Sequence, residues 1–435
     1  MALEHIRGRR VQAGDLAVVV GAGRSGLAAA RLLRRLGAKT RLLDRNTAAL
    51  DPATYDELQT LGIEVLLGEH TPAHFQKASF VVPSPGMPVA QLAHYLVPQS
   101  AGGPEVLAEM ELAWRCLEGE PVLAVTGTSG KTTTVSLAAA MLQAQGYTVF
   151  LGGNIGTPLS EYVLSGRKAD VLVLEVSSFQ LQACSTFCPR VGVLLNITPN
   201  HLDYHRDMAE YTEAKFRLFR CQDAGDLAII STDLQGLPAV QAISARRLWL
   251  ERTGRFSKSN LLGGHNQYNM EAAWQACRFF GVSQESAAHA VASFRPLPHR
   301  LEMVRRRAGV LFVNDSKCTT VSALKVALEA FEQPVRLLCG GKFKGGDLVG
   351  LVPLVRKKVV EAALFGAGRE FFEQAWQGVI PMSWHPSLQE ALHALADKAV
   401  RGDVILLAPA TASFDLYKNY QERGDDFKRI VGSLS

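Results

Sequence analysis

The sequence predicts an α/β protein of about three domains, each built around a parallel sheet. The first observation is length, because 435 residues allow about three domains of ~150 residues each. The second is the hydrophobic content of 47%, which supplies an ample core. The third is the alternation of short apolar runs with helical patterns along the chain, which is typical of parallel sheets covered on both faces by helices.

The first block of the chain opens with a strand–turn–helix unit. Its turn is Gly21-x-Gly-x-x-Gly26, and Asp44 ends the following strand. Glycines at this spacing allow a tight turn and close approach of a phosphate, while the acidic side chain can hold a hydroxyl or a base edge. The pattern fits NAD or any nucleotide diphosphate equally well, and a turn without a ligand also produces it. Strands are predicted over residues 16–20, 39–43, 64–67 and 80–82, a helix over residues 27–36, and a linker over residues 98–104.

The second block opens with the phosphate-binding pattern Thr126-Gly-Thr-Ser-Gly-Lys-Thr132. It follows a strand predicted over residues 122–125 and begins a helical pattern. Crowded backbone N–H groups, a helix N-terminus and the lysine charge bind phosphate, and the hydroxyl after the lysine can ligate Mg²⁺. Val125 replaces the usual first glycine, so the loop is a variant. An ordinary glycine turn is the alternative, but the flanking strand and helix favour ATP binding.

Charged side chains follow the next two predicted strands, over residues 171–174 and 191–195. Glu175 ends the first of them, where a second group that orders Mg²⁺ belongs. His201 lies in the loop after the second, and Lys215 follows on a helical stretch. From composition alone, a lysine on an otherwise apolar helix face is expected to extend its amine to solvent.

The third block carries two polar loops that follow predicted strands, namely Asn314-Asp-Ser-Lys-Cys-Thr319 and Gly340-Gly-Lys-Phe-Lys-Gly-Gly346. Ligands of parallel sheets bind at the carboxyl ends of strands. Two lysines and a hydroxyl gathered there suit a small dicarboxylate, although either loop alone is often only a polar turn.

Residues 264–269 add amides suited to a base edge, and Arg300 suits a transferring phosphoryl group. Strands are predicted over residues 310–313, 335–339, 362–365 and 403–407.

Composition disfavours several other classes of protein. The net charge of +5 is modest and its basic residues are scattered, which argues against nucleic-acid binding and suits small anionic substrates. The seven cysteines form no C-x-x-C pair, which indicates reduced thiols. No apolar run reaches the ~18 residues of a membrane span. We expect a cytoplasmic enzyme that acts as a monomer and binds neither membranes nor nucleic acid.

Taken in order, these motifs resemble those of the Mur ligase family over nearly the whole chain. The resemblance implies a Rossmann-like domain over residues 1–104, a central P-loop ATPase-like domain over residues 105–298 and a C-terminal Rossmann-like domain over residues 299–435. The motifs that carry it are Gly21-x-Gly-x-x-Gly26, Ser84-Pro-Gly86, Gly127-Thr-Ser-Gly-Lys-Thr132, Gly153-Asn-Ile-Gly156, Glu175-Val-Ser-Ser-Phe-Gln180, His201-x-Asp203, Tyr211-x₃-Lys215, His265-Asn-x-x-Asn269, Leu297-Pro-His-Arg300, Asp315-Ser-Lys317, Ala412-Ser-Phe-Asp415 and Gln421-x-Arg-Gly424.

The Asp315-Ser-Lys317 element is similar to that of family members that add D-glutamate, whereas their siblings carry a His-containing motif there. The resemblance thus implies an ATP-dependent ligase that adds D-glutamate to UDP-N-acetylmuramoyl-L-alanine through an acyl phosphate. It also implies two Mg²⁺ ions and a Lys215 carbamylated by CO₂. The implied catalytic residues are Lys131, His201, Lys215 and Arg300, and the implied metal ligands are Thr132, Glu175, His201 and Lys215.

The same resemblance assigns three binding sites. ATP is expected at Gly127, Thr128, Ser129, Gly130, Lys131, Thr132, Thr133, Asn269, Arg300 and Asp315. The UDP-substrate is expected at Gly23, Ser25, Asp44, Arg45, Ser84, Gly86, Asn154 and His201. D-Glutamate is expected at Lys317, Thr319, Lys344, Ser413 and Tyr420.

Five positions depart from the family pattern: Cys318, Thr320, Asn200, Ala408 and Tyr420. None of these departures removes a charged catalytic group. Two other functions fit part of the sequence. An NAD-dependent oxidoreductase would use the first block but leaves the phosphate loop without a task. A non-catalytic nucleotide-binding regulator would not need its lysines, Glu175 and His201, and all of these are present.

Overall fold

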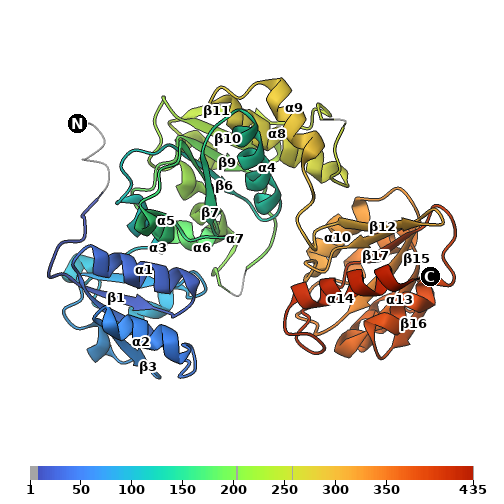
Figure 1. The fold of residues 1–435 in the computed structure, drawn as a ribbon, viewed down its shortest axis with the longest axis horizontal. Coiled ribbons are helices and arrows are strands. Elements are labelled where there is room, and N and C mark those ends of the chain that lie inside the picture. Colours follow the sequence, from blue (N-terminus) through green and yellow to red (C-terminus); the bar gives the residue numbers. More distant parts are fainter. Residues whose placement is uncertain (1–7, 202–203, 257, 435) are drawn as a thin grey trace. The chain divides into compact units, whose positions relative to one another are not determined.

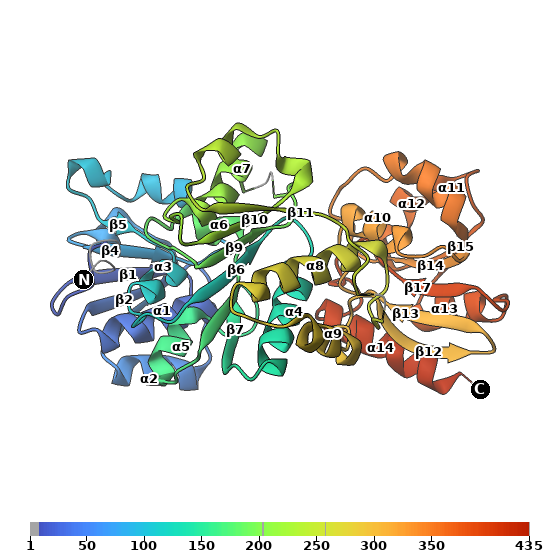
Figure 2. The same ribbon diagram turned by 90° about the horizontal axis from the view of Figure 1, so that it is seen from above.

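The computed structural model describes residues 8–201, 204–256 and 258–434. Within these ranges the protein has three sheets with helices packed on them (Figure 1). The chain forms two compact units, one comprising Met1–Thr253 with Tyr268–Val291 and the other Gly254–Gln267 with Ala292–Ser435. The first unit holds two of the sheets and the second holds the third (Figure 2).

The first sheet is parallel throughout and has the strand order β3-β2-β1-β4-β5. Its strands are β1 (Leu16–Val20), β2 (Lys39–Asp44), β3 (Ile63–Leu67), β4 (Phe80–Pro83) and β5 (Glu105–Val106). The four strands predicted from the sequence are confirmed. Helix α1 (Arg24–Arg35) follows the glycine turn and packs on β1 and β2, because small and apolar residues form one buried face along it. Helix α2 (Pro52–Thr60) begins after the N-cap Asp51, which accepts a hydrogen bond from the Thr54 amide.

The second sheet is also parallel and has the strand order β11-β10-β9-β6-β8-β7. Its strands are β6 (Val122–Thr126), β7 (Val149–Gly153), β8 (Val171–Glu175), β9 (Val191–Leu194), β10 (Leu227–Ser231) and β11 (Arg246–Leu250). Because β6 lies between β8 and β9, the loops that follow these three strands meet at one edge. The helices in this region are α3 (Glu109–Trp114), α4 (Lys131–Ala144), α5 (Leu159–Ser165), α6 (Ser178–Gln182), α7 (Met208–Phe216), α8 (Gly264–Arg278) and α9 (Gln284–Ser293).

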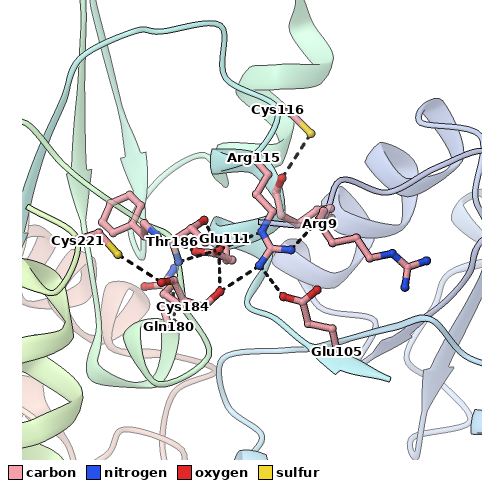
Figure 3. A network of polar contacts seen from close by, with 12 residues as sticks. Arg9, Glu105, Glu111, Arg115, Cys116, Gln180, Cys184, Thr186 and Cys221 are labelled. Atoms are coloured by element: carbon pink, nitrogen blue, oxygen red, sulfur yellow. Dashed lines mark hydrogen bonds and ion pairs between the residues drawn. The ribbon is translucent and has the colours of Figure 1, made fainter. Parts of the chain in front are cut away.

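A buried ion-pair network ties the start of the chain to helix α3 within the first unit (Figure 3). The Arg115 guanidinium donates to Glu111 Oε1 at 3.0 Å, to Glu105 Oε1 at 2.6 Å and to the Arg9 carbonyl at 2.8 Å. Glu111 has no exposed surface and also accepts from the Thr186 amide and hydroxyl. Since both charges are paired and hydrogen-bonded, the network fixes the segments it joins without leaving a buried charge unsatisfied.

The third sheet has the strand order β12-β13-β17-β14-β15-β16. Its strands are β12 (Glu302–Arg307), β13 (Val310–Asn314), β14 (Val335–Gly340), β15 (Val359–Phe365), β16 (Met382–His385) and β17 (Val404–Leu407). The helices are α10 (Val321–Glu329), α11 (Val352–Lys358), α12 (Arg369–Trp376), α13 (Leu388–Ala396) and α14 (Tyr420–Ser433). Strands β13, β17, β14, β15 and β16 are parallel neighbours. Parallel pairing was predicted for β13, β14, β15 and β17, whereas β16 was not predicted.

Strand β12 departs from the predicted all-parallel arrangement, because it pairs antiparallel to β13. A two-residue turn joins them, and its residues Ala308 and Gly309 have φ values of 49° and 82°. Positive φ at both central positions is the geometry of tight hairpin turns. This strand was not predicted from the sequence, because Glu-Met-Val-Arg-Arg-Arg contains no apolar run. No helix in the described ranges combines the length and the hydropathy needed to cross a bilayer.

Candidate active site

The phosphate-binding pattern forms a loop between β6 and α4. Gly130 takes the position before the first helical residue with φ 85°, and Lys131 opens the helix. A Cβ at Gly130 would lie 2.5 Å from Asn269 Oδ1, so only glycine fits there. The Lys131 amine donates to the carbonyls of Gly127 at 2.8 Å and Thr128 at 3.1 Å. Asn269 on α8, assigned to ATP from the sequence, therefore lies beside the phosphate loop.

Lys215 points inward to the same loop. It is 1% exposed, and its amine donates to the Gly127 carbonyl at 3.0 Å, the carbonyl that also accepts from Lys131. Burial, and then the nearby Lys131 charge, lower the pKa of Lys215 well below its usual value. The expectation from composition that this amine reaches solvent is wrong, because the helix face that bears it packs onto the phosphate loop.

Tyr211, one helical turn before Lys215, connects the same elements. Its hydroxyl is 3.0 Å from the Thr128 hydroxyl, and the Lys215 amine lies 4.6 Å from its ring centroid. This tyrosine belongs to the motif Tyr211-x₃-Lys215, but no role was predicted for it from the sequence. The i, i+4 spacing on α7 was the available signal, because residues so spaced share a helix face.

Glu175 ends β8 and is 3% exposed. Its Oε1 accepts from Asn154 Nδ2 at 2.7 Å, whereas Oε2 is buried and has no hydrogen-bond partner among the described residues. A buried carboxylate oxygen without a donor costs free energy, and a hard cation would satisfy it. In the described part of the chain no group of three or more His, Cys, Asp or Glu side chains could hold a metal ion. A Mg²⁺ ion here would therefore need further oxygens, from Thr132, a phosphate or a carbamate.

His201 follows β9 in a left-handed backbone conformation, with φ 57°. Such a conformation is strained for a non-glycine residue and is frequent at functional sites. The His201 carbonyl accepts from the amides of Tyr204 at 3.1 Å and His205 at 2.9 Å, and its ring lies 4.9 Å from that of Phe179. The Tyr204 hydroxyl donates to the Met87 carbonyl at 3.0 Å, which joins this turn to the loop after β4. Asp203 of the quoted motif lies outside the described residues.

At the edge of the first sheet, the Asp44 carboxylate is engaged by backbone donors. Oδ2 accepts from the Ala22 amide at 2.7 Å and Oδ1 from the Asn46 amide at 2.8 Å. Asp44 thereby orders the glycine turn, in which Gly21 has φ 104° and a Cβ would overlap the Ser84 hydroxyl. The other residues assigned to the UDP-substrate lie on or beside the turn, the end of β2, the loop after β4 and the loop after β7; they are Gly23, Ser25, Arg45, Gly86 and Asn154.

In the second unit, Arg300 and Asp315 lie at the start of the third sheet. Asp315 Oδ1 accepts from the Leu301 amide at 3.1 Å, and burial raises the pKa of its carboxyl to about 7 against the opposing charge of Arg300. The residues on both sides of Arg300, His299 and Leu301, have positive φ values of 63° and 42°. Strain of this kind persists where the surroundings fix the conformation.

The residues assigned to D-glutamate gather at the carboxyl edge of the third sheet. The Lys317 amine lies 3.9 Å from the Tyr420 ring centroid. Backbone hydrogen bonds between Lys342 and Ala412 join the loop after β14 to the loop after β17, which carries Ser413. Lys344 is exposed in the first of these loops. Thr319 lies in the loop after β13, so loops from the three neighbouring strands β13, β17 and β14 contribute to this edge. The loops after β13 and β14 were the two predicted from the sequence to meet here.

Cys318, a departure from the family pattern, is 2% exposed and packs in the core of the third sheet. All seven cysteines are free thiols. Since a buried thiol behaves as a small apolar group, Cys318→Ala should leave the dependence of activity on the amino-acid substrate within about twofold of the wild type. Steady-state kinetics with varied D-glutamate measure this, and loss of most activity would show that the thiol shapes the pocket.

Three protein-family models, one for each of three domains, match the chain. The Mur ligase MurD-like N-terminal domain matches residues 15–102, the Mur ligase middle domain residues 125–249, and the Mur ligase glutamate ligase domain residues 299–411.

Relatives match over the full length. A UDP-N-acetylmuramoylalanine–D-glutamate ligase from Desulfovibrio desulfuricans is 70% identical, with 100% of both chains covered. A ligase of the same name from Nitratidesulfovibrio vulgaris is 61% identical, again over 100% of both. Among solved structures, the MurF ligase from Thermotoga maritima in complex with ADP matches with a TM-score of 0.60 at 18% identity, covering 99% of each chain. At that identity the structural match supports the fold alone.

Proposed function

The chain belongs to the Mur ligase family, and from this premise we propose that it joins D-glutamate to UDP-N-acetylmuramoyl-L-alanine at the expense of ATP, in peptidoglycan precursor synthesis. The geometric observation that carries the proposal is the convergence of Lys131 and Lys215 on the Gly127 carbonyl. Both lysines lie at the sheet edge that bears Glu175. An oxidoreductase has no use for this arrangement.

Each domain takes one substrate in this proposal. Residues 1–104 bind the UDP end of the acceptor, residues 105–298 bind ATP at the phosphate loop, and residues 299–435 bind D-glutamate. The ordered glycine turn beside Asp44 supports the first assignment, because its backbone can approach a diphosphate. The lysines of the third-sheet edge support the last, because they suit two carboxylates. We place the reaction in the cytoplasm and propose that the enzyme acts as a monomer.

The chemistry follows from the residues at each site. The terminal carboxylate of UDP-N-acetylmuramoyl-L-alanine attacks the γ-phosphorus of ATP, the bond to the ADP oxygen breaks, and an acyl phosphate forms. Lys131 neutralises charge that develops on the transferring group, and Arg300 is proposed to act at the same oxygens. The amine of D-glutamate then attacks the acyl carbon, phosphate leaves, and the nitrogen loses a proton. Exclusion of water protects the acyl phosphate between the two steps.

Two Mg²⁺ ions fit the donors of the central domain. Thr132 and Glu175 would hold one, and His201 with a carbamate on Lys215 would hold the other. Two observations support this assignment. Oε2 of Glu175 has no hydrogen-bond partner among the described residues, and burial together with the Lys131 charge lowers the pKa of the Lys215 amine. Bound there, the ions would supply charge neutralisation at the phosphoryl oxygens.

A panel of amino acids tests the proposed function. Purified protein with ATP, Mg²⁺ and UDP-N-acetylmuramoyl-L-alanine should release phosphate with D-glutamate and not with L-alanine, L-lysine, meso-diaminopimelate or L-glutamate. Phosphate release with another amino acid in place of D-glutamate would contradict the proposal. Tight binding of NADH without binding of the UDP-substrate would instead favour the oxidoreductase.

Lys344 is exposed, and its amine makes no hydrogen bond or ion pair within the described residues, so it is available to a ligand. Lys344→Ala should raise the KM for D-glutamate by about tenfold or more and change the KM for ATP far less, because a charge-assisted hydrogen bond to a carboxylate is lost. Initial rates with each substrate varied in turn measure the effect. Equal increases for both substrates would place this lysine outside the amino-acid pocket. Lys325→Ala, on an exposed face of α10, serves as the control.

A further inference from the structure

Arg423, in the first turn of α14, is fully buried at 0% exposure. Its Nε donates to the Ser316 hydroxyl at 3.0 Å, and its Nη2 donates to the carbonyls of Ser316 at 3.0 Å and Thr411 at 3.1 Å. Ser316 lies in the loop after β13 and Thr411 in the loop after β17. One guanidinium therefore ties together two loops at the carboxyl edge of the third sheet.

The same contacts extend to a third loop and to α14. The Thr411 hydroxyl donates to the carbonyl of Gly340, at the end of β14, at 2.6 Å. The Ser316 hydroxyl donates to the Tyr420 carbonyl at 2.8 Å. Gly341, which follows β14, has φ 125°, and a Cβ there would come 2.4 Å from the Ala412 carbonyl oxygen and 3.1 Å from Arg423 Nη1, so the glycine allows the loops and the guanidinium to approach this closely.

The arrangement is unfavourable for stability alone. Arg423 Nη1 is buried without a hydrogen-bond partner among the described residues, and Asp415, the carboxylate that acts on this guanidinium, makes no salt bridge with it. A buried charge without a close counter-ion costs free energy. Arg336, at the other end of β14, shows the contrast, since it pairs with Asp403 at 2.7 Å and Glu361 at 3.0 Å. Arg423 thus holds the loops together but is not arranged as a structural ion pair.

We propose that Arg423 is a positioning residue for the amino-acid substrate. By fixing the loops after β13, β14 and β17 against one another, it sets the spacing of Lys317 and Ser413. Its positive charge, which is only partly offset by Asp415, favours a dicarboxylate between them. This inference rests on the proposed function and deepens it, because it assigns the selectivity for a dicarboxylic amino acid to a residue that the substrate does not touch.

Two substitutions test the inference. Arg423→Met keeps the volume and removes the charge and all donors, and it should raise the KM for D-glutamate by about tenfold or more. Arg423→Lys keeps the charge but cannot reach the three acceptors together, and it should raise that KM by about fivefold. In both, the KM for UDP-N-acetylmuramoyl-L-alanine should stay within about twofold, since its proposed site lies in another domain.

The matched control is Arg336→Met, which removes a buried arginine from the opposite end of the same strand. It leaves Asp403 and Glu361 unpaired, so it should lower the Tm more than Arg423→Met does while leaving the KM for D-glutamate unchanged. A rise of all KM values together in the Arg423 variants, or a wild-type KM for D-glutamate in Arg423→Lys, would overturn the inference. If Arg423→Met does not fold, Arg423→Lys decides.

A binding measurement separates this inference from the proposed function. Protection of the protein against thermal unfolding by D-glutamate should require at least about tenfold more ligand in Arg423→Met than in the wild type. Wild-type protein that releases no phosphate with D-glutamate would refute the proposed function. Identical D-glutamate protection curves for the variant and the wild type would refute the role of Arg423 whether or not the wild type is active.

Discussion

Replacement of Lys131 by alanine should reduce kcat on the order of 10³-fold or more, because the substitution removes the positive charge that faces the transferring phosphoryl group. The amine is held at the loop by the carbonyls of Gly127 and Thr128, a position from which it can turn to a bound phosphate. Binding of UDP-N-acetylmuramoyl-L-alanine should be nearly unchanged. Phosphate release measures the first expectation, and calorimetric titration with the UDP-substrate measures the second.

The control for this prediction is Lys168→Ala. Lys168 is 61% exposed and pairs with Glu118 at the surface, so its loss should leave kcat within about twofold. A Lys131→Ala enzyme with near-normal turnover would remove Lys131 from the mechanism and would return the loop to an ordinary glycine turn.

Lys215→Ala should also abolish most activity, and a small carboxylate such as formate or acetate should restore part of it. Only a neutral amine reacts with CO₂, forming an N–C bond and releasing a proton to give the carbamate. Burial and the Lys131 charge lower the pKa of Lys215 and so favour the neutral amine near neutral pH. The added carboxylate would supply the oxygens that the carbamate provides to a hard cation. Phosphate release with and without formate measures the rescue.

Lys215→Arg is the decisive comparison, because the arginine side chain is positively charged and cannot be carbamylated. It should stay inactive with formate present, since the larger guanidinium fills the space beside the Gly127 carbonyl. Full activity of the arginine variant would sink the carbamate hypothesis. Chemical trapping of the carbamate on the wild-type protein under CO₂, followed by mass spectrometry, gives a readout that does not depend on turnover.

Much of the fold could be predicted because its signals are local. The strand β1, the helix α4 and the turns before α1 and α4 can each be predicted from fewer than about twenty consecutive residues, because the signals are apolar runs and glycines at fixed spacing. The strands β5, β7, β10, β11, β12 and β16 were not predicted from the sequence. All of them except β10 are edge strands, which carry weaker apolar patterns because each has a neighbouring strand on one side only. Strand β10 lies inside the second sheet and is fully buried, so its apolar run Leu-Ala-Ile-Ile was a signal that the prediction missed.

The α/β class, the order of the phosphate loop, Glu175, His201 and Lys215 along the chain, and the polar edge of the third sheet could all be predicted from local sequence patterns. The surroundings of these residues follow from the tertiary structure. From composition, Lys215 was expected to be solvated. In the structure its amine is buried and donates to the carbonyl of Gly127, which lies 88 residues away in the chain. Likewise, the sequence around Arg423 gives no sign that this arginine is buried. Its burial depends on the loops after β13, β14 and β17, which pack around it in the tertiary structure. Burial and hydrogen bonding depend on segments distant in the chain, and local patterns do not encode which of those segments meet.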